Sequence, residues 1–347
     1  MALTILNVAY PLAPVSFDAT GGAEQVVAQL DAALVAAGHR SLVIACEGSQ
    51  VRGMLLPTRA ATGVLDPAAQ AAARDRHREA ITAALEHESI DLVHLHGVDF
   101  ADYLPPPGVP VLVTLHLPPS WYPAEVFLIS RPDTYLHCVS ESQAGECPPA
   151  ANLLPPLPNG VPVDELACDV EKADFVLSLG RICPEKGQHV ALDAAKRAGV
   201  PMILAGQLYD YPAHQEYFRD YIRPRLDALR RFIGPVGFVL KRDLLSRARA
   251  VLVPSLVHET SSLVAMEALA CGTPVIASSA GALPEIVEHG RTGFIADGFE
   301  AMAKAISAAH HINPDDCRAA ARERFSTART NARYLERYHE LAAVHVA

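Results

Sequence analysis

The sequence predicts an α/β protein built as two domains, each with a parallel sheet covered by helices on both faces. Short runs of apolar and β-branched residues alternate with longer segments of helical periodicity, as they do along a parallel sheet. The 347 residues correspond to about two domains of roughly 150 residues each. Half of the residues are hydrophobic and 20% are charged, so the composition excludes a disordered chain, a collagen and a coiled coil.

The first half of the chain begins with a predicted strand over 3–9, followed by a helix over 23–37 that ends at Gly38. Glycine adopts the left-handed conformation of a helix C-terminus at little cost. A second helix is predicted to begin with Asp66 as its N-cap and to run to about Glu88. Further strands of this half are expected at Ser41–Ala45, Leu92–Leu95, Val111–Leu115 and Tyr135–Val139.

The segment 155–163, PPLPNGVPV, contains four prolines and an Asn-Gly turn and is predicted as the linker. We therefore expect an N-terminal Rossmann-like domain over 1–160 and a C-terminal Rossmann-like domain over 161–325. The final helix, over 326–347, could pack on either domain as far as its sequence shows. We expect it to pack back on the N-terminal domain. The strands expected in the second domain are 175–179, 202–204, 231–233, 251–253, 274–276 and 293–295.

The chain carries a net charge of −10, and residues 1–160, with 7 Arg and no Lys against 16 acids, account for −9 of it. Nucleic acids and anionic membrane surfaces bind basic faces, so neither partner is expected. No apolar run approaches about 18 residues, and Met1–Tyr10 lacks the features of a signal peptide. Seven scattered cysteines without a C-x-x-C pair or zinc-ligand spacing indicate a reducing compartment. We expect a cytoplasmic protein without a transmembrane segment.

The clearest local signal is the segment 258–278, HETSSLVAMEALACGTPVIAS. Glu259 follows a predicted strand, and Thr260, Ser261 and Ser262 are N-cap residue types in front of an apolar helix. The N-terminus of that helix lies at the carboxyl edge of the sheet, where open α/β sheets bind ligands. Its free N–H groups and positive dipole end are suited to an anion.

The two acids of this segment, Glu259 and Glu267, are eight residues apart, which is roughly 12 Å if the whole segment is helical. Hydrolytic pairs of carboxylates lie closer, at about 5 Å or 6.5–9.5 Å, so this pair is a poor glycosidase site. The spacing instead fits one acid at each end of an extended nucleotide-sugar. The alternative is that Glu259 caps the helix and Glu267 is a solvated helix residue.

Two cations follow another predicted strand, in the segment 180–187, GRICPEKG. Arg181 and Lys186 both reach a diphosphate from the carboxyl end of that strand, unless they are ordinary surface charges. The sequence has no G-x-x-x-x-G-K-[ST] and no G-x-G-x-x-G motif. Nucleotide triphosphate hydrolysis and dinucleotide oxidoreduction therefore lose their usual sequence support.

Five blocks together resemble glycosyltransferase family 4, the glycosyl transferases group 1. They are GGAE at 21–24 with GHR at 38–40, NGVPVD at 159–164, GRICPEKG at 180–187, the E-x7-E pair, and ACGTPVIAS after it. The resemblance implies a GT-B fold, with two Rossmann-like domains facing across a cleft, acceptor on the N-terminal side and nucleotide-sugar on the C-terminal side. It also implies retaining transfer of a hexose from a nucleotide diphosphate sugar, without a metal or another cofactor.

The resemblance assigns roles in the C-terminal domain residue by residue. Arg181 and Lys186 would hold the donor diphosphate, Glu267 the ribose hydroxyls, and Glu259 hydroxyls of the transferred sugar. The remaining donor-binding positions that it implies are Gly180, Ser261, Ser262 and Leu263.

In the N-terminal domain, the resemblance implies that Gly22 lets the first loop approach the donor phosphate and that His116 contacts the sugar. The chain departs from the family at 260–262, where Thr-Ser-Ser replaces the common Pro-Phe-Gly. This departure leaves the donor sugar open, and the nucleotide base and the acceptor are open as well. The alternatives to transfer are a nucleotide-sugar epimerase or hydrolase of the same fold, and a non-catalytic nucleotide-sugar-binding subunit.

For a possible metal pair and a possible nucleophilic cysteine, a structural role is favoured over a functional one. His94 and His96 share a strand face but have no third metal ligand at a recognisable spacing. Cys271 is expected at a helix end as a packed thiol, because the dipole there does not stabilise a thiolate. Trp121 and Tyr122 either line an acceptor pocket or pack in an interface, and the sequence does not separate these alternatives.

Overall fold

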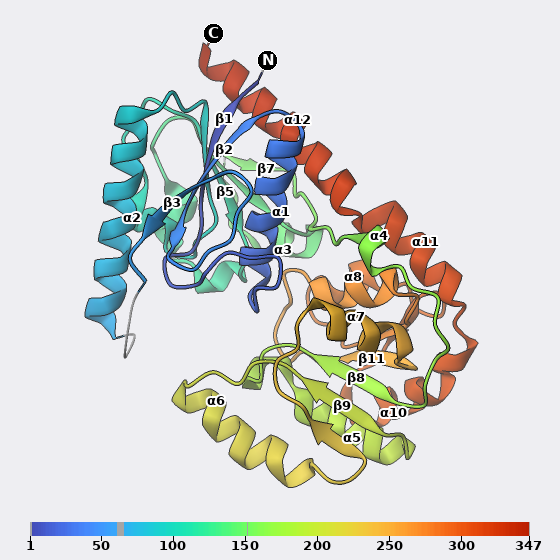
Figure 1. The fold of residues 1–347 in the computed structure, drawn as a ribbon. Coiled ribbons are helices and arrows are strands. Elements are labelled where there is room, and N and C mark those ends of the chain that lie inside the picture. Colours follow the sequence, from blue (N-terminus) through green and yellow to red (C-terminus); the bar gives the residue numbers. More distant parts are fainter. Residues whose placement is uncertain (1, 61–65, 151, 347) are drawn as a thin grey trace. The chain divides into compact units, whose positions relative to one another are not determined.

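The computed structural model describes residues 2–60, 66–150 and 152–346. The chain forms two compact units, Met1–Pro158 together with Thr330–Ala347, and Asn159–Arg329 (Figure 1). Each unit contains one parallel sheet with helices packed against it, so the predicted α/β class is confirmed. None of the described helices is long and apolar enough to cross a lipid bilayer.

The first unit has a seven-stranded sheet in the order β3-β2-β1-β4-β5-β6-β7. Its strands are β1 (Thr4–Val8), β2 (Arg40–Cys46), β3 (Met54–Thr58), β4 (Leu92–Leu95), β5 (Val111–Leu115), β6 (Thr134–Cys138) and β7 (Leu153–Leu154). Its helices are α1 (Gly22–Ala36), α2 (Pro67–His87), α3 (Glu141–Glu146) and, from Thr330 onward, α12 (Thr327–Val346). The strand order reverses between β1 and β4, the place at which open α/β sheets bind ligands.

The helices of the first unit cover both faces of its sheet (Figure 1). On one face, Ile5 of β1 packs with Leu30 of α1 and with Tyr334 and Tyr338 of α12. On the other face, strand residues pack with Ile81 of α2. The C-terminal helix thus contributes two fully buried tyrosines to the core of the first unit.

The second unit has a six-stranded sheet in the order β10-β9-β8-β11-β12-β13. Its strands are β8 (Val176–Leu179), β9 (Met202–Ala205), β10 (Arg230–Phe232), β11 (Ala250–Val253), β12 (Val275–Ala277) and β13 (Gly293–Ile295). Its helices are α4 (Val163–Leu166), α5 (Gln188–Ala198), α6 (Pro212–Tyr217), α7 (Phe238–Arg247), α8 (Leu263–Ala270), α9 (Leu283–Ile286), α10 (Gly298–Ala308) and α11 (Pro314–Phe325). The order reverses between β8 and β11, so the loops after these strands are expected to form a site.

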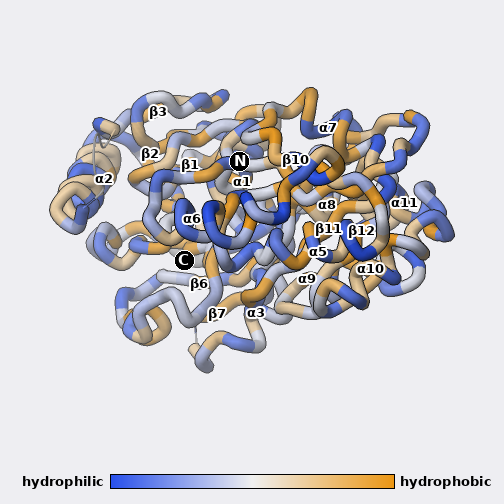
Figure 2. Tube along the Cα trace, turned by 90° about the horizontal axis from the view of Figure 1, so that it is seen from below, coloured by the Kyte–Doolittle hydropathy of each residue, from blue (hydrophilic) through white to orange (hydrophobic). Residues whose placement is uncertain are grey.

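Successive residues of the central strands point into two different cores, because side chains alternate along a strand. Leu252 and Ile276 pack with α5 and α10, whereas Val251 and Val275 pack with α7, α8 and α11. Both faces are buried, and the strands are therefore apolar throughout, as the hydropathy colours of β11 and β12 show (Figure 2). This rigid sheet fixes the positions of the loops at its carboxyl edge.

Two strands of the first sheet were not predicted, and both are at or near its edges. β3 is the edge strand beside β2 and contains Pro57, a residue that breaks strand patterns but is tolerated at an edge because it has no N–H to donate. β7 has two residues and directly precedes the proline-rich segment 155–163. Neither segment carries enough of a periodic signal to be recognised.

Candidate functional site

The loop after β8 lies directly on the loop after β11. It contains the short 3-10 helix η4 (Pro184–Lys186), and the carbonyl of Glu185 accepts a hydrogen bond from Leu256 N at 2.8 Å. Gly187 ends η4 with a φ of +61°, and a Cβ there would lie 2.2 Å from the carbonyl oxygen of Pro254. Glycine at this position therefore allows the two loops to make their close approach.

Lys186 and Glu259 form an ion pair where these two loops meet. Lys186 Nζ lies 2.6 Å from Glu259 Oε1, and the Ser255 hydroxyl donates to the same oxygen at 2.6 Å. Glu259 is 9% exposed and Lys186 is 32% exposed, so the carboxylate is held from inside while the ammonium group reaches solvent. A carboxylate has about four acceptor positions, which leaves capacity for ligand hydroxyls.

The segment that follows Glu259 caps helix α8 as predicted. Ser262 is the N-cap, and its hydroxyl accepts a hydrogen bond from Ala265 N at 3.3 Å. The first N–H groups of such a helix have no intrahelical partner, so they are available to an anion. Ser261 and Leu263 flank the cap, which places three of the predicted donor-binding residues at one helix end.

The predicted 12 Å separation of Glu259 and Glu267 rested on a continuous helix, and that premise is wrong. The helix begins only at Leu263. Glu259 instead forms an isolated parallel bridge with Gly281, and its carbonyl accepts a hydrogen bond from Ala282 N at 2.7 Å. The extended backbone before α8 sets the position of Glu259, and helical geometry does not apply to it.

Glu267 lies inside α8 and pairs with a residue that the sequence analysis missed. Lys241 Nζ of α7 lies 2.6 Å from Glu267 Oε1, and the two side chains are 11% and 5% exposed. The reading of Glu267 as a solvated helix residue is therefore wrong. Neither residue could be paired from sequence, because the contact joins two different helices.

Arg181 is partly buried and lies in the same loop as Lys186. It follows Gly180, whose φ is +146° and whose amide donates to the Ala205 carbonyl at 3.0 Å. The Arg181 carbonyl accepts a hydrogen bond from Gln188 Nε2 at 2.7 Å, which fixes the backbone of the loop. Both predicted cations thus lie in one loop at the carboxyl edge of the second sheet.

In the first unit, His116 directly follows β5, and its backbone is held from both sides. Gln143 Nε2 donates to the carbonyls of Leu115 at 2.8 Å and Leu117 at 2.9 Å. Burial, followed by the neighbouring His137, lowers the pKa of His116 to about 3, so its imidazole is neutral near pH 7. Gly22, the other predicted residue of this unit, is the exposed first residue of α1.

Two buried histidines, His94 and His96, belong to the same polar cluster as His116. His116 Nε2 lies 3.1 Å from His96 Nδ1, and the ring of His94 lies 3.9 Å from that of His96. Both ring nitrogens of His94 have protein partners, Tyr338 and Thr114. This pairing agrees with the structural reading of His94, whereas the buried Nε2 of His96 has no hydrogen-bond partner among the described residues.

Cys271 and Tyr122 are both buried in hydrophobic cores. Cys271 follows α8 and is 1% exposed, and burial raises the pKa of its thiol to about 11, as expected of a packed thiol. Tyr122 is buried in the core of the first unit, whereas Trp121 is 47% exposed. All seven cysteines are free thiols.

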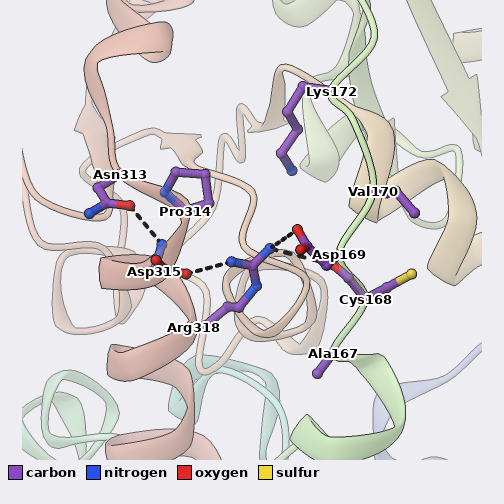
Figure 3. A pocket seen from close by; sticks show the side chains of 9 residues that line it. All are labelled: Ala167, Cys168, Asp169, Val170, Lys172, Asn313, Pro314, Asp315 and Arg318. Carbon is purple, nitrogen blue, oxygen red and sulfur yellow. Dashed lines mark hydrogen bonds and ion pairs between the residues drawn. The ribbon is translucent and has the colours of Figure 1, made fainter.

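An open pocket of about 590 Å³ lies elsewhere in the second unit, between the segment after α4 and the start of α11 (Figure 3). Its two cations are already engaged. Arg318 pairs with Asp315 and Asp169, and Lys172 Nζ donates to the carbonyl of Ser246 at 2.7 Å. None of the predicted site residues lines this pocket, so it is separate from the loops after β8 and β11.

Two family profiles match the chain on either side of the linker. The profile described as Glycosyltransferase Family 4 covers residues 20–164, and the one described as Glycosyl transferases group 1 covers residues 173–311. The chain belongs to glycosyltransferase family 4. The GT-B assignment of the fold follows from solved family structures. For example, the glycosyltransferase AviGT4, involved in avilamycin A biosynthesis, is 26% identical with a TM-score of 0.73 over 98% of both chains.

Other comparisons agree with this family. An alpha-maltose-1-phosphate synthase of Mycolicibacterium smegmatis is 32% identical over 209 residues, which are 54% of this chain and 53% of that protein. The chain thus spans about half the length of this relative, and less of several further curated relatives. The Anabaena protein HepE, solved in complex with UDP-glucose, is 19% identical, with a TM-score of 0.73 over 97% of this chain and all of HepE, and shares the fold.

Proposed function

We propose that this family 4 chain is a retaining, metal-independent glycosyltransferase that moves a hexose from a nucleotide diphosphate sugar to an acceptor. The observation that carries the proposal is the ion pair of Lys186 and Glu259, in the loop that leads into α8. It combines a cation, a hydroxyl-accepting carboxylate and a helix N-terminus at one point. A sugar diphosphate presents the complementary groups, namely hydroxyls and an anion.

In this proposal, Arg181 and Lys186 bind the donor diphosphate together with the first amides of α8. Charge develops on the diphosphate as it leaves, and pre-positioned cations stabilise that charge more than they stabilise the ground state. Glu259 accepts hydrogen bonds from the transferred sugar and Glu267 from the ribose. His116 is neutral and contacts the sugar by hydrogen bonding rather than by charge.

The stereochemical course proposed is substitution on one face of the sugar. The bond between the anomeric carbon and the diphosphate oxygen breaks through an oxocarbenium-like state. The acceptor hydroxyl attacks the same face and passes its proton to the departing phosphate oxygen. No carboxylate nucleophile is needed in this scheme, in line with the engagement of Glu259 by Lys186 and Ser255.

The test is a turnover assay with a panel of nucleotide diphosphate sugars, each with and without candidate acceptors. Sugar phosphates and inositol phosphates belong in the acceptor panel because curated relatives are named for such products or substrates. Lys186→Ala should lower turnover by about 100-fold or more while the fold survives, since it removes a group that stabilises the leaving charge. Retention is read from the anomeric configuration of the product.

The control is Lys196→Ala, which removes an exposed lysine at the end of α5 and should leave turnover unchanged. Near-normal turnover of Lys186→Ala would contradict the proposed role of the ion pair. Product formed equally well without any acceptor would favour an epimerase or hydrolase. Tight donor binding without turnover would favour a binding subunit.

A further inference from the structure

Cys183, Glu185 and His214 bring a thiol, a carboxylate and an imidazole together in the second unit. One ligand atom of each lies within 4.8 Å of the other two. Cys183 and Glu185 belong to the η4 loop, and His214 belongs to α6. The proposed transfer reaction uses none of these three side chains, so their convergence requires a separate explanation.

The imidazole of His214 is held in place but lacks a partner on one nitrogen. Its ring packs edge-on against Tyr209 and Tyr211, with centroid distances of 6.3 and 5.1 Å. Its Nδ1 atom is buried, and the described residues give it no hydrogen-bond partner. A buried polar atom without a protein partner is uncommon in folded proteins, and this one is therefore a candidate ligand atom.

The other two residues supply anionic ligands of different softness. Cys183 is 1% exposed, and its thiol lies within hydrogen-bonding reach of the Glu185 carboxylate. Burial tends to raise the pKa of Glu185, but hydrogen bonds and the positive charge of Arg181 lower it below its usual value, so this carboxylate is charged. A thiolate and a carboxylate together neutralise the charge of a divalent ion.

The spacing and chemistry of the three atoms suit zinc. In a tetrahedral zinc site with bonds of about 2.0–2.3 Å, neighbouring ligand atoms lie about 3.5 Å apart. The three ligand atoms lie up to 4.8 Å apart, and small side-chain movements would bring them to about 3.5 Å. Sulfur and imidazole ligands favour zinc over magnesium or calcium, which prefer oxygen.

We propose that Cys183, Glu185 and His214 form a binding site for a zinc-class divalent ion, with an open fourth position for water. The bound ion would join α6 to the loop that carries Arg181 and Lys186. Sequence spacing does not reveal the site, because His214 comes from a separate helix. The ion takes no part in the proposed transfer step, so this inference stands or falls independently of the proposed function.

The experiment is a titration of the full chain with Co²⁺, after treatment with a chelator and without added thiols. Cobalt bound to a thiolate gives a near-ultraviolet charge-transfer absorption, which reports the sulfur ligand directly. We expect one such site per chain. Its affinity should rise with pH, because burial raises the pKa of the Cys183 thiol to about 11 and the metal must displace that proton.

The variants are Cys183→Ser, His214→Ala and the matched control Cys168→Ser, a partly buried cysteine outside the cluster. The absorption should vanish in Cys183→Ser, and the affinity should fall more than about tenfold in His214→Ala, while Cys168→Ser behaves as the unmodified chain. Circular dichroism of each variant checks the fold. No charge-transfer band in the unmodified chain, or an unchanged band in Cys183→Ser, would overturn the proposal.

Discussion

The ion pair of Lys241 and Glu267 is a residue-scale feature with a direct consequence for stability. Both side chains are almost fully buried and their charged atoms are 2.6 Å apart. Two charges that leave water together lose hydration, and their mutual pairing offsets part of that loss. Removing either residue leaves the other charge buried without this counter-charge.

We expect Lys241→Met to lower the free energy of unfolding by about 3 kcal/mol. Glu267→Leu should cost a similar amount, and the double variant should recover much of the loss because no buried charge remains. Urea denaturation of the four proteins gives the double-mutant cycle. Single variants that each cost less than about 1 kcal/mol would show that the pair is hydrated and not buried.

Local residue roles could be predicted from the sequence, and long-range ones could not. Asp66 and Ser262 were expected to start helices, and each caps one by accepting from an amide three residues ahead. A cap is encoded within one turn of chain. The partners Lys241 and Ser255 depend instead on how separate elements pack, and no spacing in the sequence indicates them.

At the scale of elements, a row of hydrogen bonds ties three strands of the first sheet to α12. His137 Nδ1 must donate to the Cys138 carbonyl at 3.0 Å, because a carbonyl only accepts. Its Nε2 therefore accepts from Thr114, whose oxygen in turn accepts from His94 Nε2. His94 Nδ1 is then left to accept from the Tyr338 hydroxyl. One carbonyl thus fixes the tautomer of both histidines.

This row of hydrogen bonds requires neutral histidines. We therefore expect the free energy of unfolding to decrease at acid pH. Burial lowers the pKa of His137 to about 4, whereas the unfolded chain titrates near 6.5. Between these values the unfolded state binds more protons, so stability is complete above pH 6.5 and is lost as pH falls toward 4. His137 alone should contribute a slope of up to about 1.4 kcal/mol per pH unit in this window.

Urea unfolding of the unmodified chain and of His137→Gln between pH 5 and 8 measures this contribution. The stability difference between them should be constant above about pH 6.5 and should shrink below it. His310→Gln, at an exposed histidine outside the row, serves as the control and should keep the slope of the unmodified chain. Parallel curves for His137→Gln and the unmodified chain would refute the burial of a neutral His137.

Among the strands, the central ones could be predicted from the sequence and the edge strands could not. Central strands such as β1, β5 and β11 were predicted to within about two residues because both faces are buried and their sequences are mostly apolar. The edge strands β3 and β7 escaped because exposure and proline weaken that pattern. The start of α8 after Ser262 was predicted from its N-cap residue types, and only the 12 Å separation, which assumed a helix from Glu259 onward, was wrong.

At the scale of the whole molecule, one chain builds two parallel sheets, and each reverses its strand order at its centre. The motifs that identified the family lie mostly in loops at the carboxyl ends of strands, where packing constrains them least. This explains why the family could be recognised from sequence while the pairing of its side chains required coordinates. Donor and acceptor identity depend on ligand contacts and are therefore matters for binding experiments.

The most direct test of the central claim is calorimetric titration of the chain with a panel of nucleoside diphosphates and their sugars. At least one should bind, and Lys186→Met should weaken that binding about tenfold or more, since a charge-assisted hydrogen bond contributes about 1.5–3 kcal/mol. Lys196→Met, at the exposed end of α5, should bind as the unmodified chain does. Failure of every nucleoside diphosphate to bind, or equal affinities for all three proteins, would contradict a diphosphate site at Lys186 and Glu259.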